Sequence, residues 1–157
     1  ARKAYLLNHL IDTIRGTLFR QTMFAEFERD IHRMAEAGEP LTADSLSNHY
    51  FELNKLYHGP GVNPDDDIRY EWARIPHFHY DFYVYKYATG ISAALALSKK
   101  ILDGETEGYL RFLKAGDSKE VIDIMKDAGV DFTTPAPVQD AMDVFAEQVK
   151  ELKKCLK

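Results

Sequence analysis

Apolar residues recur at the spacing of an α-helix along almost the whole chain, and this periodicity most constrains the fold. Near the N-terminus they form one helical face, which consists of Leu6, Leu7, Leu10, Ile11 and Ile14. An apolar residue at every third or fourth position predicts a helix with one buried side. Residues 82–87 are rich in β-prone side chains, but they run directly into a helical pattern over residues 88–97, so a helix is expected there as well. The chain is predicted to be all-α.

Glycine and proline mark where the expected helices end. Threonine and serine favour helix starts, and Thr42 and Ser118 are predicted to be N-caps. We expect the helices to form a single multi-helix domain over residues 1–157. They are predicted over residues 3–37, 42–58, 65–75, 77–102, 105–114, 118–128 and 135–152.

The composition limits the classes of function. The 157 residues carry a net charge of −5, and this acidic balance argues against a nucleic-acid partner or a membrane partner. Cys155 is the only cysteine, which excludes an internal disulfide or a thiolate metal cluster, and a cytoplasmic location is expected. No apolar run reaches the roughly 20 residues of a membrane span. Because the helical pattern starts without an initiator methionine or a cap residue, we expect a tag or a longer protein to precede it.

The residues that could carry chemistry are concentrated in residues 74–90. Four of the nine tyrosines fall within residues 80–87, just after two histidines. On a helix, His77, Tyr80 and Tyr87 share one face, and Tyr83 lies between them. Such a row of hydrogen-bond donors can hold a substrate carbonyl or a developing oxyanion. Simple aromatic packing is an alternative that the pattern leaves open.

Metal ligation by this chain is not expected. His77 and His79 could form a two-histidine pair, but side chains two positions apart on a helix point away from each other. None of the six histidines is followed by glutamate, so the zinc motif His-Glu-x-x-His is absent. The sequence also has no nucleophile elbow and no phosphate-binding loop. No metal ligand is therefore predicted in these 157 residues.

Two segments resemble a known family. Residues 18–28, Leu-Phe-Arg-Gln-Thr-Met-Phe-Ala-Glu-Phe-Glu, and residues 70–90, which begin Tyr-Glu-Trp-Ala-Arg-Ile-Pro-His-Phe, are similar to the C-terminal part of oligoendopeptidase F. That family consists of zinc peptidases related to thimet oligopeptidase. The resemblance extends from about Tyr5 to Leu156.

The resemblance implies a mostly helical catalytic region that acts on short peptides, with zinc as cofactor. The zinc ligands of the family precede the point where this chain begins, so the chain is expected to be inactive alone and to need the N-terminal part of the enzyme as its partner. The family places a histidine and tyrosines on the substrate side. By that resemblance His77, Tyr80 and Tyr87 are the expected catalytic residues, and Tyr83 and His79 are expected to bind substrate. The alternative is a non-enzymatic helical domain that binds a peptide or a protein.

Overall fold

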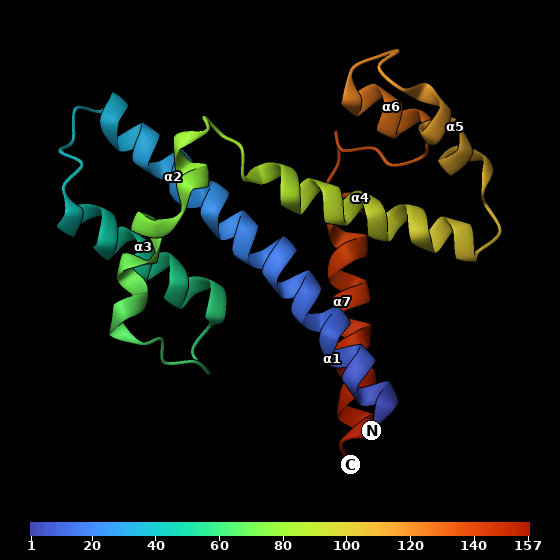
Figure 1. Ribbon diagram of the computed structural model, residues 1–157, viewed down its shortest axis with the longest axis horizontal. Coiled ribbons are helices and arrows are strands. Elements are labelled where there is room, and N and C mark those ends of the chain that lie inside the picture. Colours follow the sequence, from blue (N-terminus) through green and yellow to red (C-terminus); the bar gives the residue numbers. More distant parts are fainter. The chain divides into compact units, whose positions relative to one another are not determined.

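In a computed structural model, which describes residues 1–157, every regular element of the chain is helical (Figure 1). There are seven α-helices, one π-helical turn and two 3₁₀ helices, and no residue lies in a strand. The all-α prediction is confirmed. The chain divides into two compact units, residues 16–88 and residues 1–15 with 89–157. A single domain over residues 1–157 stays a prediction.

The unit of residues 16–88 is built on two helices and a 3₁₀ helix. Helix α2 (Arg20–Glu36) contacts α3 (Ala43–His58), and η2 (Asp66–Arg74) packs on α3. Helix α2 places Phe24 and Phe27 on its buried face, about one helical turn apart, and α3 adds Tyr50 to them. The buried core residues are Met23, Phe24, Phe27, Tyr50, Leu53 and Val84.

Side-chain caps fix where two of these elements begin. Thr42 and Ser45 form a capping box at the start of α3, in which each side chain bonds the other's backbone N–H at 3.1 and 2.9 Å. The predicted N-cap at Thr42 is confirmed. The Asp65 carboxylate accepts from the Asp67 N–H at 2.9 Å and caps η2. Ser118 is not a cap, since α6 (Val121–Asp127) begins after Glu120 without a side-chain cap bond.

The single helix predicted over residues 3–37 is interrupted. Helix α1 (Arg2–Ile14) passes through the π-helical turn η1 (Arg15–Phe19) before α2 begins. Gly16 lies in this turn, and its missing β-carbon would meet no other atom within 4 Å. The low helix propensity of glycine makes a local departure from the α-helix inexpensive. The Thr22 hydroxyl donates to the Leu18 carbonyl at 2.7 Å and satisfies one acceptor of the turn.

The helix predicted over residues 77–102 starts later than expected. Helix α4 spans Tyr85–Leu102, and residues 76–79 form only the short 3₁₀ helix η3 (Pro76–His79). Between them Asp81 and Phe82 have φ angles of 45° and 58°, in the left-handed region. A right-handed helix cannot pass through two such residues. The prediction of one helix here is wrong.

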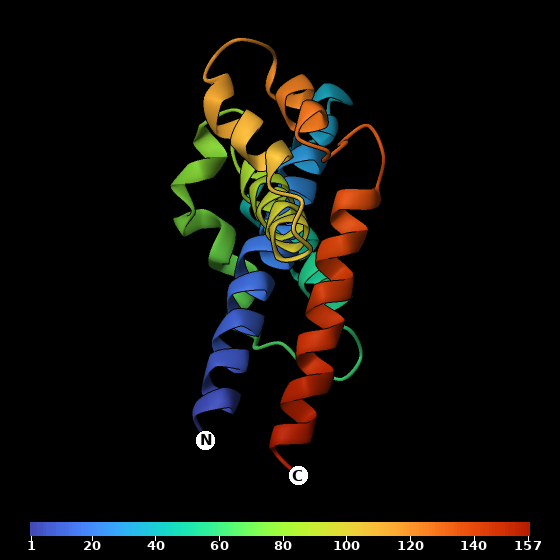
Figure 2. The ribbon, with the colours of Figure 1, turned by 90° about the vertical axis from the view of Figure 1, so that its right-hand side faces the viewer.

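The second unit contains both ends of the chain. Helix α7 (Ala136–Cys155) runs beside α1 in both views (Figures 1 and 2), and Lys3 Nζ lies 3.1 Å from Glu151 Oε2. Helix α5 (Glu107–Ala115) contacts α6, and a β-carbon at Gly108 would lie 2.5 Å from the Ala128 carbonyl oxygen. The buried core cluster of this unit consists of Ala96, Leu97, Met125, Ala128 and Val130. None of the helices combines the length and apolar composition that a membrane span requires.

Candidate active site

The candidate site lies on the segment that connects η2 to α4, within residues 75–87. Pro76 occupies the first position of η3, where its fixed φ favours a helical start and its missing N–H is not needed. The chain then turns at Asp81 and Phe82 before Tyr85 begins α4. The side chains predicted to lie on one helix therefore come from a 3₁₀ helix, a turn and an α-helix.

Four rings of this segment nevertheless come together. The His77 ring lies 5.8 Å from that of Tyr80, 5.6 Å from that of Tyr83 and 6.0 Å from that of Tyr87, between centroids. Tyr83 lies 6.0 Å from Tyr80 and 5.6 Å from Tyr87. All five contacts fall in the range favoured by aromatic pairs. We call these four residues the ring cluster. The prediction that they lie along one face of a single helix is wrong, because η3, a turn and α4 supply them.

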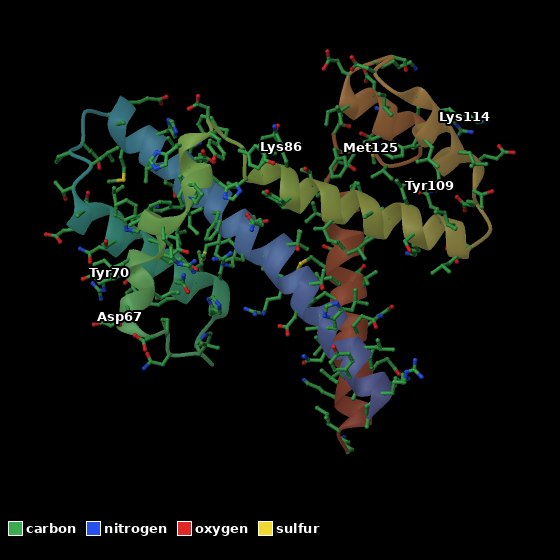
Figure 3. All side chains as sticks on the ribbon, in the orientation of Figure 1. Asp67, Tyr70, Lys86, Tyr109, Lys114 and Met125 are labelled. Carbon is green, nitrogen blue, oxygen red and sulfur yellow. The ribbon has the colours of Figure 1, made fainter.

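The ring cluster presents hydrogen-bond donors to solvent. Tyr80 is 57% exposed and Tyr87 is 37% exposed, whereas His77 and Tyr83 are half-buried. The Tyr87 hydroxyl lies 3.5 Å from His77 Nε2. A hydrogen bond with Tyr83 raises the pKa of Tyr87 above its ordinary value. Lys86, labelled in Figure 3 in the first turn of α4, places its ammonium 4.9 Å from the centre of the Tyr83 ring.

His79 lies outside the ring cluster. It is exposed at the end of η3, and no ring of the cluster contacts it. The physical reason is the 3₁₀ geometry, in which side chains two positions apart point in different directions. Its role in substrate binding stays a prediction.

A buried carboxylate anchors the element that leads into the site. Glu71, at 9% exposure, accepts hydrogen bonds from Tyr50 and Arg20, each at 2.5 Å, and from Arg74 at 2.6 Å. Burial alone would raise the pKa of the Glu71 carboxyl, but the bonds from Tyr50 and Arg20 outweigh it and hold that pKa below its ordinary value. The charged carboxylate ties η2 to α2 and α3, five residues before Pro76.

A second buried carboxylate holds the turn itself. Glu28 on α2 is 1% exposed, and its Oε1 accepts from the backbone N–H of Phe82 at 2.8 Å. The Phe82 ring packs on His32, one helical turn further along α2, with ring centroids 4.5 Å apart. The left-handed turn therefore rests on two side chains of the same helix.

Comparison with known proteins places the chain in a family. The sequence pattern described as Peptidase family M3 matches residues 1–144. The chain belongs to peptidase family M3. The M3 chain is 52% identical to the oligopeptidase PepF of Bacillus subtilis over 158 aligned positions, gaps included, and the match covers 99% of this chain and 24% of that protein. It is 46% identical to the plasmid-encoded oligoendopeptidase F of Lactococcus lactis subsp. cremoris, over 95% of this chain and 25% of that protein.

The solved structures agree with this assignment. The crystal structure of oligoendopeptidase-F from Enterococcus faecium matches the M3 chain with a TM-score of 0.94 and 50% identity, over 98% of this chain and 30% of that one. The resemblance to oligoendopeptidase F is thus confirmed. The M3 chain spans about a quarter of the length of the relatives it matches. Its position at their C-terminal end stays a prediction.

The side chains of the M3 chain do not form a metal site. No group of three or more His, Cys, Asp or Glu side chains lies close enough together to hold a metal ion. The zinc ions of peptidases have at least three protein ligands. The residues present here therefore cannot hold, by themselves, the zinc that the resemblance implies for the whole enzyme.

Sequence reasoning missed both buried carboxylates of the M3 chain. One signal for Glu28 was available, because Phe24, Phe27, Glu28 and Ile31 follow the spacing of an apolar helix face. A carboxylate within such a face is buried and needs a partner. Glu71 gave a weaker signal, since its partners Arg20 and Tyr50 lie 51 and 21 residues away along the chain.

Proposed function

We propose that the M3 chain forms part of a zinc metalloendopeptidase that hydrolyses short peptides, and that it supplies contacts to the substrate and to the oxyanion. Family membership supports a peptidase, and the relatives are named oligopeptidases and oligoendopeptidases. The observation that carries the assignment of the site is the ring cluster, in which the His77 imidazole lies within about 6 Å of three phenols, between ring centroids.

Hydrolysis of a peptide bond places negative charge on the former carbonyl oxygen as the carbon becomes tetrahedral. Hydrogen-bond donors that are already oriented stabilise this charge more than they stabilise the neutral substrate. His77, Tyr80 and Tyr87 are assigned this donor role.

Tyr83 and His79 are assigned to the substrate. Tyr83 stacks on His77 with an interplanar angle of 26°, so it also orients the imidazole. The zinc ligands and the base that activates water are assigned to the part of the enzyme outside residues 1–157, which is then the partner of this chain. The expected inactivity of the chain alone and its cytoplasmic location belong to the same proposal.

A non-enzymatic role in peptide or protein binding is the second candidate. One observation favours it, namely the exposure of the large rings Tyr80, Phe82 and Tyr85, at 57%, 45% and 51%. Exposed aromatic rings near one another are typical of contact surfaces. In this case the rings would bind a partner without contributing to hydrolysis.

His77→Ala in the full-length enzyme separates the two candidates. If His77 donates to the oxyanion, its loss lowers kcat on a short fluorogenic peptide by roughly 10²–10³-fold while the zinc content and the Tm change little. Tyr70→Phe is the matched control, since Tyr70 is 59% exposed on η2 and outside the ring cluster. An unchanged kcat together with a lowered Tm refutes the assignment of His77 as an oxyanion donor.

A further inference from the structure

The turn between the two halves of the ring cluster is strained. Asp81 and Phe82 both have a positive φ, of 45° and 58°, although neither is glycine. Residues with a β-carbon rarely adopt this conformation because the side chain crowds the backbone. Two of them in succession persist only where surrounding contacts enforce them.

The contacts that enforce this turn come from α2. The Glu28 carboxylate binds the Phe82 N–H at 2.8 Å, and the His32 ring packs against the Phe82 ring. Since Glu28 is 1% exposed, water does not compete for this bond. Val84, two residues further on, is 1% exposed in the aromatic core and fixes the far side of the turn.

The turn sets the geometry of the ring cluster. His77 and Tyr80 precede it, and Tyr83 and Tyr87 follow it, so every ring contact between these pairs spans Asp81 and Phe82. A change of φ at these two residues would move one pair of rings relative to the other. The hydrogen-bond partner of Glu28 is the backbone of the turn and not one of the four rings.

We propose that Glu28 is a positioning residue of the peptidase, which holds the Asp81–Phe82 turn in its left-handed conformation and thereby aligns His77 and Tyr80 with Tyr83 and Tyr87. The inference rests on the proposed function of the ring cluster. This positioning role differs from a purely structural role, because Glu28 affects turnover by setting the positions of His77 and the tyrosines.

The test uses the full-length enzyme with a short fluorogenic peptide, below the Tm of every variant. Glu28→Ala removes the acceptor of the Phe82 N–H, and we expect kcat to fall about 10- to 100-fold with little change in KM, as misplacement of a catalytic group by about 1 Å does. Glu28→Gln keeps a carbonyl acceptor and should retain kcat within about threefold of wild type. If Glu28→Ala does not fold, Glu28→Asp is used in its place. The shorter aspartate moves the carboxylate away from the Phe82 N–H by the length of one methylene.

Glu26→Ala is the matched control. Glu26 lies on the same helix and accepts from the Tyr57 hydroxyl at 2.8 Å, but it does not contact the turn. It should lower the Tm and leave kcat unchanged. The proposal is overturned if Glu26→Ala lowers kcat as much as Glu28→Ala, or if kcat of Glu28→Ala, or of Glu28→Asp in its place, equals that of the wild type.

A double variant gives the readout that a structural role would not change. If Glu28 acts through the ring cluster, Glu28→Ala combined with His77→Ala should lower kcat by clearly less than the product of the two single losses, because part of the function that Glu28 aligns is already lost. Losses that multiply contradict the proposal. A wild-type kcat for His77→Ala would instead refute the function of the ring cluster, so the two failures are distinguishable.

Discussion

Replacing Glu71 by glutamine should destabilise the unit of residues 16–88 by about 3 kcal/mol. Breaking a buried ion pair costs about 3–5 kcal/mol of folding free energy. The Arg20 side chain is 35% exposed and regains water when the pair is lost, so the loss of the Arg20–Glu71 pair should cost about 3 kcal/mol, the lower end of that range. Arg74 is 71% exposed and contributes under about 1 kcal/mol. The Tyr50 hydroxyl can still donate to the glutamine oxygen, so only the charge of that bond is lost.

The assay is urea unfolding of the 157-residue chain, followed by the fluorescence of Trp72. Trp72 is the only tryptophan and lies on η2, and its indole N–H donates to the Ser47 hydroxyl of α3 at 3.0 Å, so its fluorescence reports on this unit. Glu52→Gln is the control, because Glu52 is 68% exposed in its pair with Lys55 and should change stability by less than about 0.5 kcal/mol.

The pH dependence has a defined sign. The pKa of Glu71 is lowered in the folded state, so its contribution is present above the unfolded carboxyl pKa of about 4.3 and is lost as the pH falls through the folded value. The difference between wild type and Glu71→Gln should therefore be largest near pH 7 and shrink below about pH 4.3. A difference under about 1 kcal/mol at pH 7, or one that grows toward acid pH, refutes the argument.

Four further outcomes are expected. The 157-residue chain alone should bind no stoichiometric zinc and cleave no peptide, and zinc found in the purified chain by metal analysis contradicts this. Tyr80→Phe in the full-length enzyme should lower kcat about 10-fold or more without a change in Tm, since the ring stays and only the exposed hydroxyl is lost. Gly108→Ala should cost about 1–3 kcal/mol in urea unfolding, because its β-carbon would meet the Ala128 carbonyl at 2.5 Å. Gly90→Ala, where a β-carbon would meet nothing within 4 Å, should instead stabilise α4 by up to about 1 kcal/mol.

The sequence was sufficient for the helical architecture but not for its interruptions. Periodicity over many residues predicts α2 and α3, and local chemistry predicts the cap at Thr42. The π-helical turn at Arg15–Phe19 shifts the apolar pattern by a single residue. Such a small shift is hard to distinguish from an uninterrupted helix with 3.6 residues per turn. The turn at Phe82 depends on Glu28, 54 residues away, and no local pattern reveals such a partner.

For the candidate site, the sequence predicted one helical face, and the structure has a different geometry. A helical face would place His77, Tyr80 and Tyr87 along a stripe, one or two turns apart. In the structure a turn at Asp81 and Phe82 interrupts the helix, and Tyr83 contacts the rings of all three. The roles of these residues stay predictions. Local propensity alone continues the helix through residues 80–84. The helix is interrupted there by a tertiary contact, the hydrogen bond from the Phe82 N–H to Glu28, which the sequence does not reveal.

The pairing of α1 with α7 has a consequence for the order in which the chain folds during synthesis. Helix α1 buries only Ile14, and its partner is so distant that Lys3 and Glu151 are 148 residues apart in sequence. The ribosome therefore completes residues 16–88, whose helices contact one another locally, long before α7 exists. Contacts between distant segments form slowly because the intervening chain must first be ordered. The aromatic core and the turn that Glu28 holds can thus form before α7 is synthesised and pairs with α1.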